Sequence, residues 1–100
     1  MLRLVLNNLN GVSDMILNVY AIRDDKSEAY MQPWFAPTNG AAIRNFSDAV
    51  NQNDSPFAKH PEDYVLFHIG QYDDSRGVII PLDAPKSLGV AVEFKESANG

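Results

Sequence analysis

The sequence contains no cysteine. A disulfide framework, a thiolate metal site and a cysteine nucleophile are therefore excluded. It also lacks an apolar run long enough to span a bilayer, and residues 1–6 are too short and too quickly followed by polar residues for a signal peptide. We therefore expect a cytosolic protein of 100 residues with one modest core, stabilised by packing or by oligomerisation.

Positive charge is sparse and scattered. The chain has 8 Lys and Arg against 13 Asp and Glu, which gives a net charge of -5, and no two basic residues are adjacent. Every basic residue except Arg3 has a carboxylate within four positions. A nucleic-acid-binding protein usually carries a basic patch. Any positive surface on this chain must therefore be assembled by folding or by association of subunits.

Motifs for catalysis and metal binding are also missing. There is no glycine-rich phosphate loop, no serine in a nucleophile elbow and no zinc ligand spacing. The carboxylate pairs could bind magnesium or act as an acid and a base, but each falls in a turn context where aspartate caps backbone groups. His60 and His68 have no ligand spacing that would join them to Asp63. We predict no catalytic residue, no metal site and no cofactor.

One amphipathic helix is clearly present. Pro33 and Pro37 make the segment before it extended, and Thr38 suits the N-cap position because its hydroxyl can accept a free N–H of the first turn. Apolar residues then recur at helical spacing, with polar residues on the other side. We predict a helix over residues 38–51, with one face buried in a core.

Strands are predicted on both sides of this helix. Residues 15–23 are apolar on both alternating faces, as expected of a central strand. The turn at 24–27 returns as a second strand in which Tyr30 and Trp34 share a face and Phe35 points the other way. A second hairpin follows the helix, and Pro81 should end it. The predicted strands are 15–23, 29–36, 64–70, 78–80 and, as the favoured alternative to a short helix, 88–94.

This order predicts an α+β fold, a small antiparallel sheet of four to five strands with one main helix packed on one face. The domain covers residues 15–95. Residues 1–14 form either an extra strand or an extension ahead of a start at Met15, and residues 96–100 form a flexible tail. Because no second helix covers the other face of the sheet, that face should meet water, a ligand or another subunit. We expect a homodimer.

Four segments resemble one viral family. They are AYMQPWFAPTNGAAIRNFSDAVN (29–51), SPFAKHPEDY (55–64), GQYDD (70–74) and PKSLGVA (85–91). The chain is similar over roughly residues 15 to 95 to the small nonstructural protein of gokushoviruses, single-stranded-DNA phages of the family Microviridae. The resemblance implies a counterpart of the microvirus C protein, which joins the replication complex and turns DNA synthesis toward packaging into procapsids. The implied location is the cytoplasm of the infected bacterium.

Six residues are candidates for contacts with viral single-stranded DNA. Aromatic rings can stack on unpaired bases and basic side chains can contact phosphates. The plainer interpretation makes the rings core or dimer contacts, lets Arg44 pair with Asp48, and leaves the other basic groups to solubilise the surface. The candidates are Arg23, Lys26, Tyr30, Trp34, Arg44 and Lys59.

Two functions remain open at this point. The first is a non-enzymatic protein that binds single-stranded DNA, the replication complex or both, and switches synthesis toward packaging. The second is a protein-binding adaptor or an inhibitor of a host factor, without direct DNA contact. Direct phosphate contact would weaken steeply with salt, whereas an adaptor would not bind DNA at all.

Overall fold

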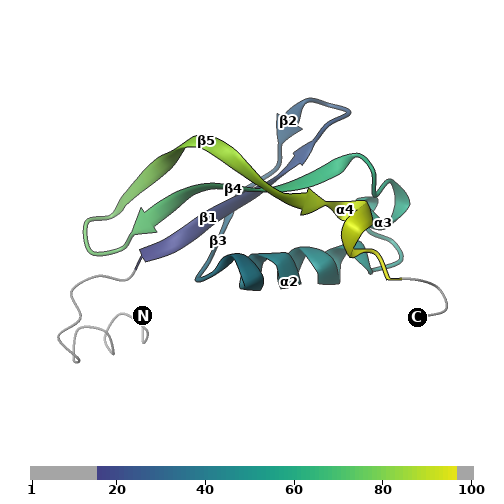
Figure 1. Cartoon of the computed structure of the whole chain (residues 1–100), viewed down its shortest axis with the longest axis horizontal. Coiled ribbons are helices and arrows are strands. Elements are labelled where there is room, and N and C mark those ends of the chain that lie inside the picture. The colour runs from purple at the N-terminus through teal and green to yellow at the C-terminus, as the bar shows by residue number, and fades with distance from the viewer. Residues whose placement is uncertain (1–15, 97–100) are drawn as a thin grey trace.

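An antiparallel sheet of five strands lies over one main helix in the computed structural model, which describes residues 16–96 (Figure 1). The predicted α+β class is confirmed. In chain order the elements are β1 (Ile16–Asp24), β2 (Ala29–Tyr30), β3 (Trp34–Ala36), α2 (Asn39–Val50), α3 (Pro56–Lys59), β4 (Tyr64–Asp73), β5 (Val78–Val90) and α4 (Ala91–Phe94).

The first strand, β1, is central, as its two apolar faces predicted. The strand order is β2-β1-β4-β5, and β3 pairs with β1 on the same side as β2. Tyr20 and Ile22 point toward α2 and belong to the main core, whereas Val19 and Ala21 point to the opposite face. All four side chains are buried, so β1 is covered on both faces.

Helix α2 begins and ends where its sequence indicates. The Thr38 hydroxyl accepts a hydrogen bond from the Ala41 N–H at 3.1 Å, which caps the first turn. At the other end, the Asn51 amide donates to the carbonyl oxygens of Ser47 and Phe94 and so joins α2 to α4. The helix buries one stripe against the sheet, made of Ala42, Phe46 and Val50.

The prediction that Pro81 ends the second hairpin is wrong. Strand β5 continues through Pro81 to Val90, because it lies at the edge of the sheet, where a missing N–H is tolerated. Gly70 lies opposite Pro81 in the register. A Cβ atom on Gly70 would come within 2.8 Å of the Ile80 carbonyl oxygen, so the close approach of β5 requires glycine there.

Two other local predictions need correction. The predicted strand 29–36 is two short strands, β2 and β3, separated by residues 31–33, where Pro33 interrupts the pairing. Residues 91–94 are helical rather than extended, and the Glu93 carboxylate accepts the Val90 N–H at 2.8 Å. The short helix α3, capped by the Ser55 hydroxyl, was not predicted. The alternatives for residues 1–14, and residues 97–100 of the predicted tail, lie outside the described residues.

The turn between β4 and β5 is held by Asp73. Its carboxylate accepts hydrogen bonds from the Ser75 N–H and hydroxyl, and it forms an ion pair with Arg76 at 2.8 Å. These bonds, with that of Ser75 foremost, hold the pKa of the Asp73 carboxyl below its usual value of 3.8. Asp73 belongs to one of the carboxylate pairs that the sequence assigns to turns, and its contacts are those of a turn.

No helix within residues 16–96 has the length and apolarity needed to cross a membrane.

Candidate binding surface

The sheet face opposite α2 carries four aromatic side chains from three strands, which we call the aromatic face. Its members are Tyr30 of β2, Phe35 of β3, and Phe67 and Tyr72 of β4. The rings of Tyr30 and Phe67 meet edge to face with centroids 5.6 Å apart. Those of Phe35 and Tyr72 stack at 5.1 Å. The rings therefore form two pairs that cross the line of β1.

Small residues in β1 make room for these rings. Phe35 lies opposite Val19 in one pairing, and Phe67 lies opposite Ala21 in the other. Val19 and Ala21 are only 3% and 1% exposed, although the described elements place no helix on this face. The aromatic rings themselves are therefore the layer that covers β1 here.

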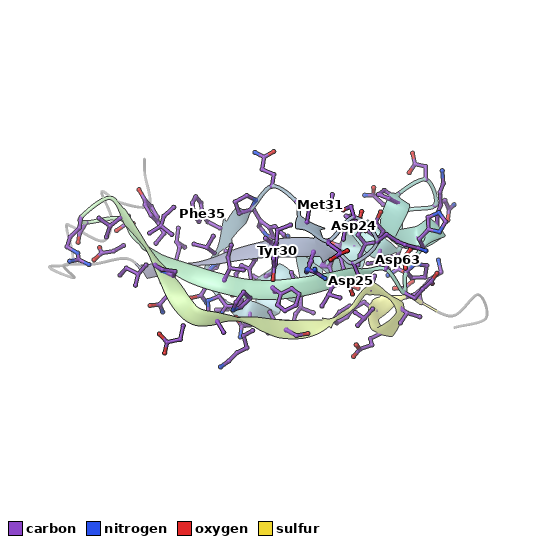
Figure 2. The ribbon with its side chains drawn as sticks, turned by 90° about the horizontal axis from the view of Figure 1, so that it is seen from above. Asp24, Asp25, Tyr30, Met31, Phe35 and Asp63 are labelled. Carbon is purple, nitrogen blue, oxygen red and sulfur yellow. The ribbon has the colours of Figure 1, made fainter. Side chains whose placement is uncertain are left out.

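The outer surfaces of the rings are open to solvent. Tyr30 is 45% exposed and Phe35 is 48% exposed, and the neighbouring Met31 is 40% exposed. Ile79 of β5, opposite Tyr72 in the register, extends the same face and is 58% exposed. Figure 2 looks onto this side and shows Phe35, Tyr30 and Met31 together on it. An exposed apolar patch on a small domain marks a site of interaction.

Carboxylates gather at one end of this face, where β1 ends and β4 begins. Asp24, Asp25 and Asp63 form what we call the acidic rim (Figure 2). The Asp25 N–H donates to the Asp63 carbonyl oxygen at 2.8 Å, which holds the two turns together. Burial raises the pKa of the Tyr64 hydroxyl, and the charges of Asp24 and Asp63 raise it further. This end of the molecule is therefore electronegative.

Two of the candidate DNA contacts lie together on this face. Arg23 is opposite Tyr30 in the register of β1 and β2, and Lys26 lies in the turn that joins the two strands. The Arg23 guanidinium forms an ion pair with Asp25. The charge of Arg23 is therefore already compensated, and the acidic rim prevents a basic patch at this point.

Trp34 lies on the other side of the sheet, so the prediction that it shares a face with Tyr30 is wrong. Its indole N–H donates to the Asn45 side-chain oxygen at 3.2 Å, and its ring lies 6.0 Å from that of Tyr20. The break at residues 31–33 resets the alternation between β2 and β3. Trp34 is half-buried against the core, as the plainer interpretation predicted.

Arg44 and Lys59 are also separated from the aromatic face. Arg44 is exposed on α2, and Lys59 ends α3, which packs beside α2. Within residues 16–96 Arg44 forms no ion pair, so its predicted pairing with Asp48 is absent from that part of the chain. The six candidates do not form one surface, and their contacts with DNA stay predictions.

Sequence reasoning missed most of the aromatic face. It assigned Phe35 to the face opposite Tyr30, and it gave Phe67 and Tyr72 no role. The available signal was β1 itself, because its second apolar face needs a cover that no predicted helix supplies. Large residues of matching parity in the flanking strands are the natural candidates for that cover.

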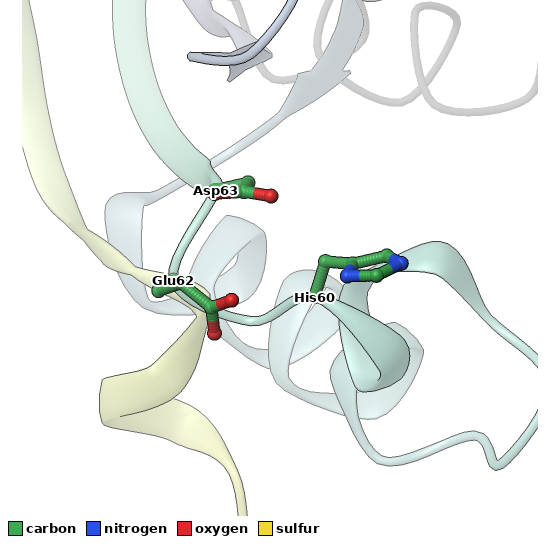
Figure 3. Close-up of side chains that lie close together, drawn as sticks. All are labelled: His60, Glu62 and Asp63. Carbon is green, nitrogen blue, oxygen red and sulfur yellow. The ribbon is translucent and has the colours of Figure 1, made fainter.

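One cluster of potential metal ligands lies in the turn before β4. His60, Glu62 and Asp63 each offer one ligand atom, and these atoms lie within 4.8 Å of one another (Figure 3). His68 is not part of the cluster, since its ring nitrogen lies 2.9 Å from the Gly70 carbonyl oxygen on β4. Three solvent-accessible groups from one turn make an incomplete shell compared with a four-ligand zinc site. The cluster therefore supports no metal assignment.

Comparisons with known proteins give one family. The sequence profile described as Phage ORF5 protein matches residues 17–94. The chain is 38% identical over 69 residues to Protein ORF5 of Chlamydia phage 1, a match that covers 65% of this chain and 72% of that protein. No solved structure matches the chain.

Proposed function

This chain belongs to the phage ORF5 protein family, and on that premise we propose that it is a non-enzymatic protein that acts at viral DNA replication and packaging. It works by binding, with the aromatic face as its contact surface for viral single-stranded DNA, the replication complex or both. Its place of action is the cytoplasm of the infected bacterium. The outcome of binding is a switch of DNA synthesis toward packaging into procapsids, the role that the gokushovirus resemblance implies.

The observation that supports a binding function is the exposure of the aromatic face. Tyr30 and Phe35 each leave nearly half of their surface in solvent, on a sheet face that no helix within residues 16–96 covers. Such rings can stack on unpaired bases, which stabilises single-stranded complexes by roughly 1–3 kcal/mol per base. They are equally suited to the apolar centre of a protein interface, where aromatic residues dominate the binding energy.

Direct DNA contact would use Tyr30 and Phe35 as the stacking platform. Arg23 and Lys26 lie at the end of the same face and would contact the phosphates. Trp34 is not available for stacking in this arrangement, because its ring faces α2 and its N–H is bonded to Asn45.

The test is fluorescence anisotropy of a labelled oligothymidylate titrated with the protein at low and near-physiological salt. Direct contact predicts binding that weakens with salt, with a log-log slope near -0.7 for each phosphate neutralised. Phe35→Ala should weaken binding. Val92→Ala is the matched control, since Val92 is an exposed apolar residue on α4. Flat traces at both salt concentrations would exclude direct DNA contact.

The acidic rim favours a second candidate, a protein-binding adaptor or host-factor inhibitor that does not touch DNA. Carboxylates at the end of the aromatic face repel phosphates but attract a basic protein surface. Crosslinking of the purified protein to the viral replication protein, with Phe35→Ala as the negative control, tests this candidate. The homodimer stays a prediction, and sedimentation at tens of micromolar protein is its test.

A further inference from the structure

We infer that the aromatic face and the acidic rim together form a docking site for an extended, positively charged segment of a partner protein. This site rests on the proposed function, because it assigns a partner chemistry to the same surface. The occupant that we infer is a basic polypeptide, rather than DNA or a second copy of this chain.

The apolar part of the site is a strip made of two ring pairs and Ile79. Ile79 and Tyr72 are cross-strand neighbours, Tyr72 stacks on Phe35, and Phe67 and Tyr30 continue the strip toward the acidic rim. Strand β4 runs from Tyr72 in this strip to Tyr64 beside the acidic rim, a distance of about 26 Å at the rise of a β-strand, so strip and rim together have this length. An extended peptide of about eight residues has the same length. Its alternate side chains would lie on the rings.

The charged part of the site lies at one end of that strip. Asp24, Asp25 and Asp63 form the rim, and the Glu62 carboxylate lies near Asp63 in the same turn. Two cations neighbour these four carboxylates, Arg23 at the end of β1 and Lys26 in the turn that follows, and the Arg23 guanidinium is already held by Asp25. Lysine or arginine side chains at one end of a bound segment would meet these carboxylates. They could also lie against the Tyr30 ring.

Charge favours a basic polypeptide over DNA and over a second copy of the chain as the occupant of this site. A DNA strand on the aromatic face would bring phosphates beside the acidic rim, and the net charge of -5 would oppose it over longer distances. A second copy would bring the same net charge and another acidic rim to the contact. A basic segment is attracted by both features.

The first experiment uses anisotropy of a labelled peptide of about eight residues, in which phenylalanine alternates with serine and the last positions are lysine. A matched peptide carries glutamate in place of lysine. We expect the lysine peptide to bind and the glutamate peptide to bind at least about tenfold more weakly. Phe35→Ala should reduce affinity for the lysine peptide about tenfold, as expected for a central aromatic contact. Equal binding of the two peptides, or full binding by Phe35→Ala, would overturn the inference.

Charge variants locate the site. The double variant Asp25→Asn/Asp63→Asn neutralises two rim carboxylates and also frees Arg23 from its ion pair. Its matched control is Asp48→Asn/Asp54→Asn, which changes net charge equally in α2 and in the loop after it. The rim variant should lose several-fold more affinity for the lysine peptide than the control does. Equal losses would show that only overall charge matters, and would overturn the site.

The same variants separate this inference from the proposed function. If oligothymidylate binds at the aromatic face, its affinity should be higher for the rim variant than for the unchanged protein. The affinity of the lysine peptide should change in the opposite direction. A protein that binds oligothymidylate but not the lysine peptide, and that loses the oligothymidylate when Phe35 is changed to alanine, would overturn the docking site. The proposed function by direct DNA contact would then still stand. Absence of binding to both probes would overturn both uses of the surface. A dimer that Phe35→Ala dissociates would instead make the face a contact between two copies.

Discussion

The rings of Phe35 and Tyr72 stack with their centroids 5.1 Å apart and their planes 26° from parallel. The two residues lie on β3 and β4, strands that both pair with β1 and are not paired with each other. Their contact closes over Val19 and supplies the second cover that this central strand requires. The same rings thus stabilise the sheet with one surface and offer the other to a partner.

Phe35→Ala should therefore be a mild substitution. It removes one stacked pair and uncovers Val19, which we expect to lower the free energy of unfolding by about 1 kcal/mol. Phe46→Ala, in the buried core, should lower it by about 3–5 kcal/mol. Urea denaturation measures both. A loss for Phe35→Ala as large as that for Phe46→Ala would show that the ring belongs to the core and is not available for binding.

Gly70→Ala should destabilise the edge of the sheet. The added Cβ would lie 2.8 Å from the Ile80 carbonyl oxygen, and this clash with backbone can be relieved only by moving β5. We expect the free energy of unfolding to fall by about 1–3 kcal/mol. Gly40→Ala is the control, because the nearest atom to its new Cβ is 3.8 Å away and alanine favours the helix. Thermal melts of the two variants should shift in opposite directions.

Tyr20→Phe removes a buried hydroxyl that links β1 to the start of α2. The Tyr20 hydroxyl donates to the Asn39 side-chain oxygen at 2.6 Å and accepts from the Asn18 amide at 3.0 Å. Its loss leaves both amides short of a partner, at an expected cost of about 1–2 kcal/mol. Tyr72→Phe should be nearly neutral in the same urea assay. Equal effects would mean that the Tyr20 hydrogen bonds add nothing to stability.

Asp73 should make the stability of the fold depend on pH under acidic conditions. Its folded-state pKa lies below the usual aspartate value because Ser75 and Arg76 donate to the carboxylate. The stabilisation is therefore fully present above the pKa of the unfolded chain and is lost as pH falls through the folded-state pKa. Melting temperatures of the native protein and of Asp73→Asn should differ by a constant amount down to about pH 4 and converge below it. A difference that is unchanged at lower pH would contradict this role.

Local sequence features determined the main helix and the central strand. Thr38 and the apolar stripe that follows it predicted α2, because capping and helical periodicity act within one segment. The double apolar pattern of β1 predicted its central position for the same reason. The gokushovirus resemblance, read from four segments, is confirmed by the family match.

Interactions between segments decided the remainder. Strand β5 passes Pro81 because its outer edge is unpaired within the described sheet. Residues 91–94 form α4, where the Asn51 side chain donates a hydrogen bond to the Phe94 carbonyl oxygen. Neither fact is visible in the residues concerned. The side of the sheet that Trp34 faces depends on the break at residues 31–33, which interrupts the alternation on which the sequence prediction relied.

The sequence by itself thus determined that this protein has a capped main helix, a central apolar strand and a surplus of negative charge. Tertiary structure alone decided that Tyr30, Phe35, Phe67 and Tyr72 meet on one face and that an acidic rim lies at its end. The physical reason is that alternation along a strand assigns residues to two faces without saying which face a helix will cover. Pairing register and the position of α2 make that choice, and both are set by contacts between residues far apart in the chain.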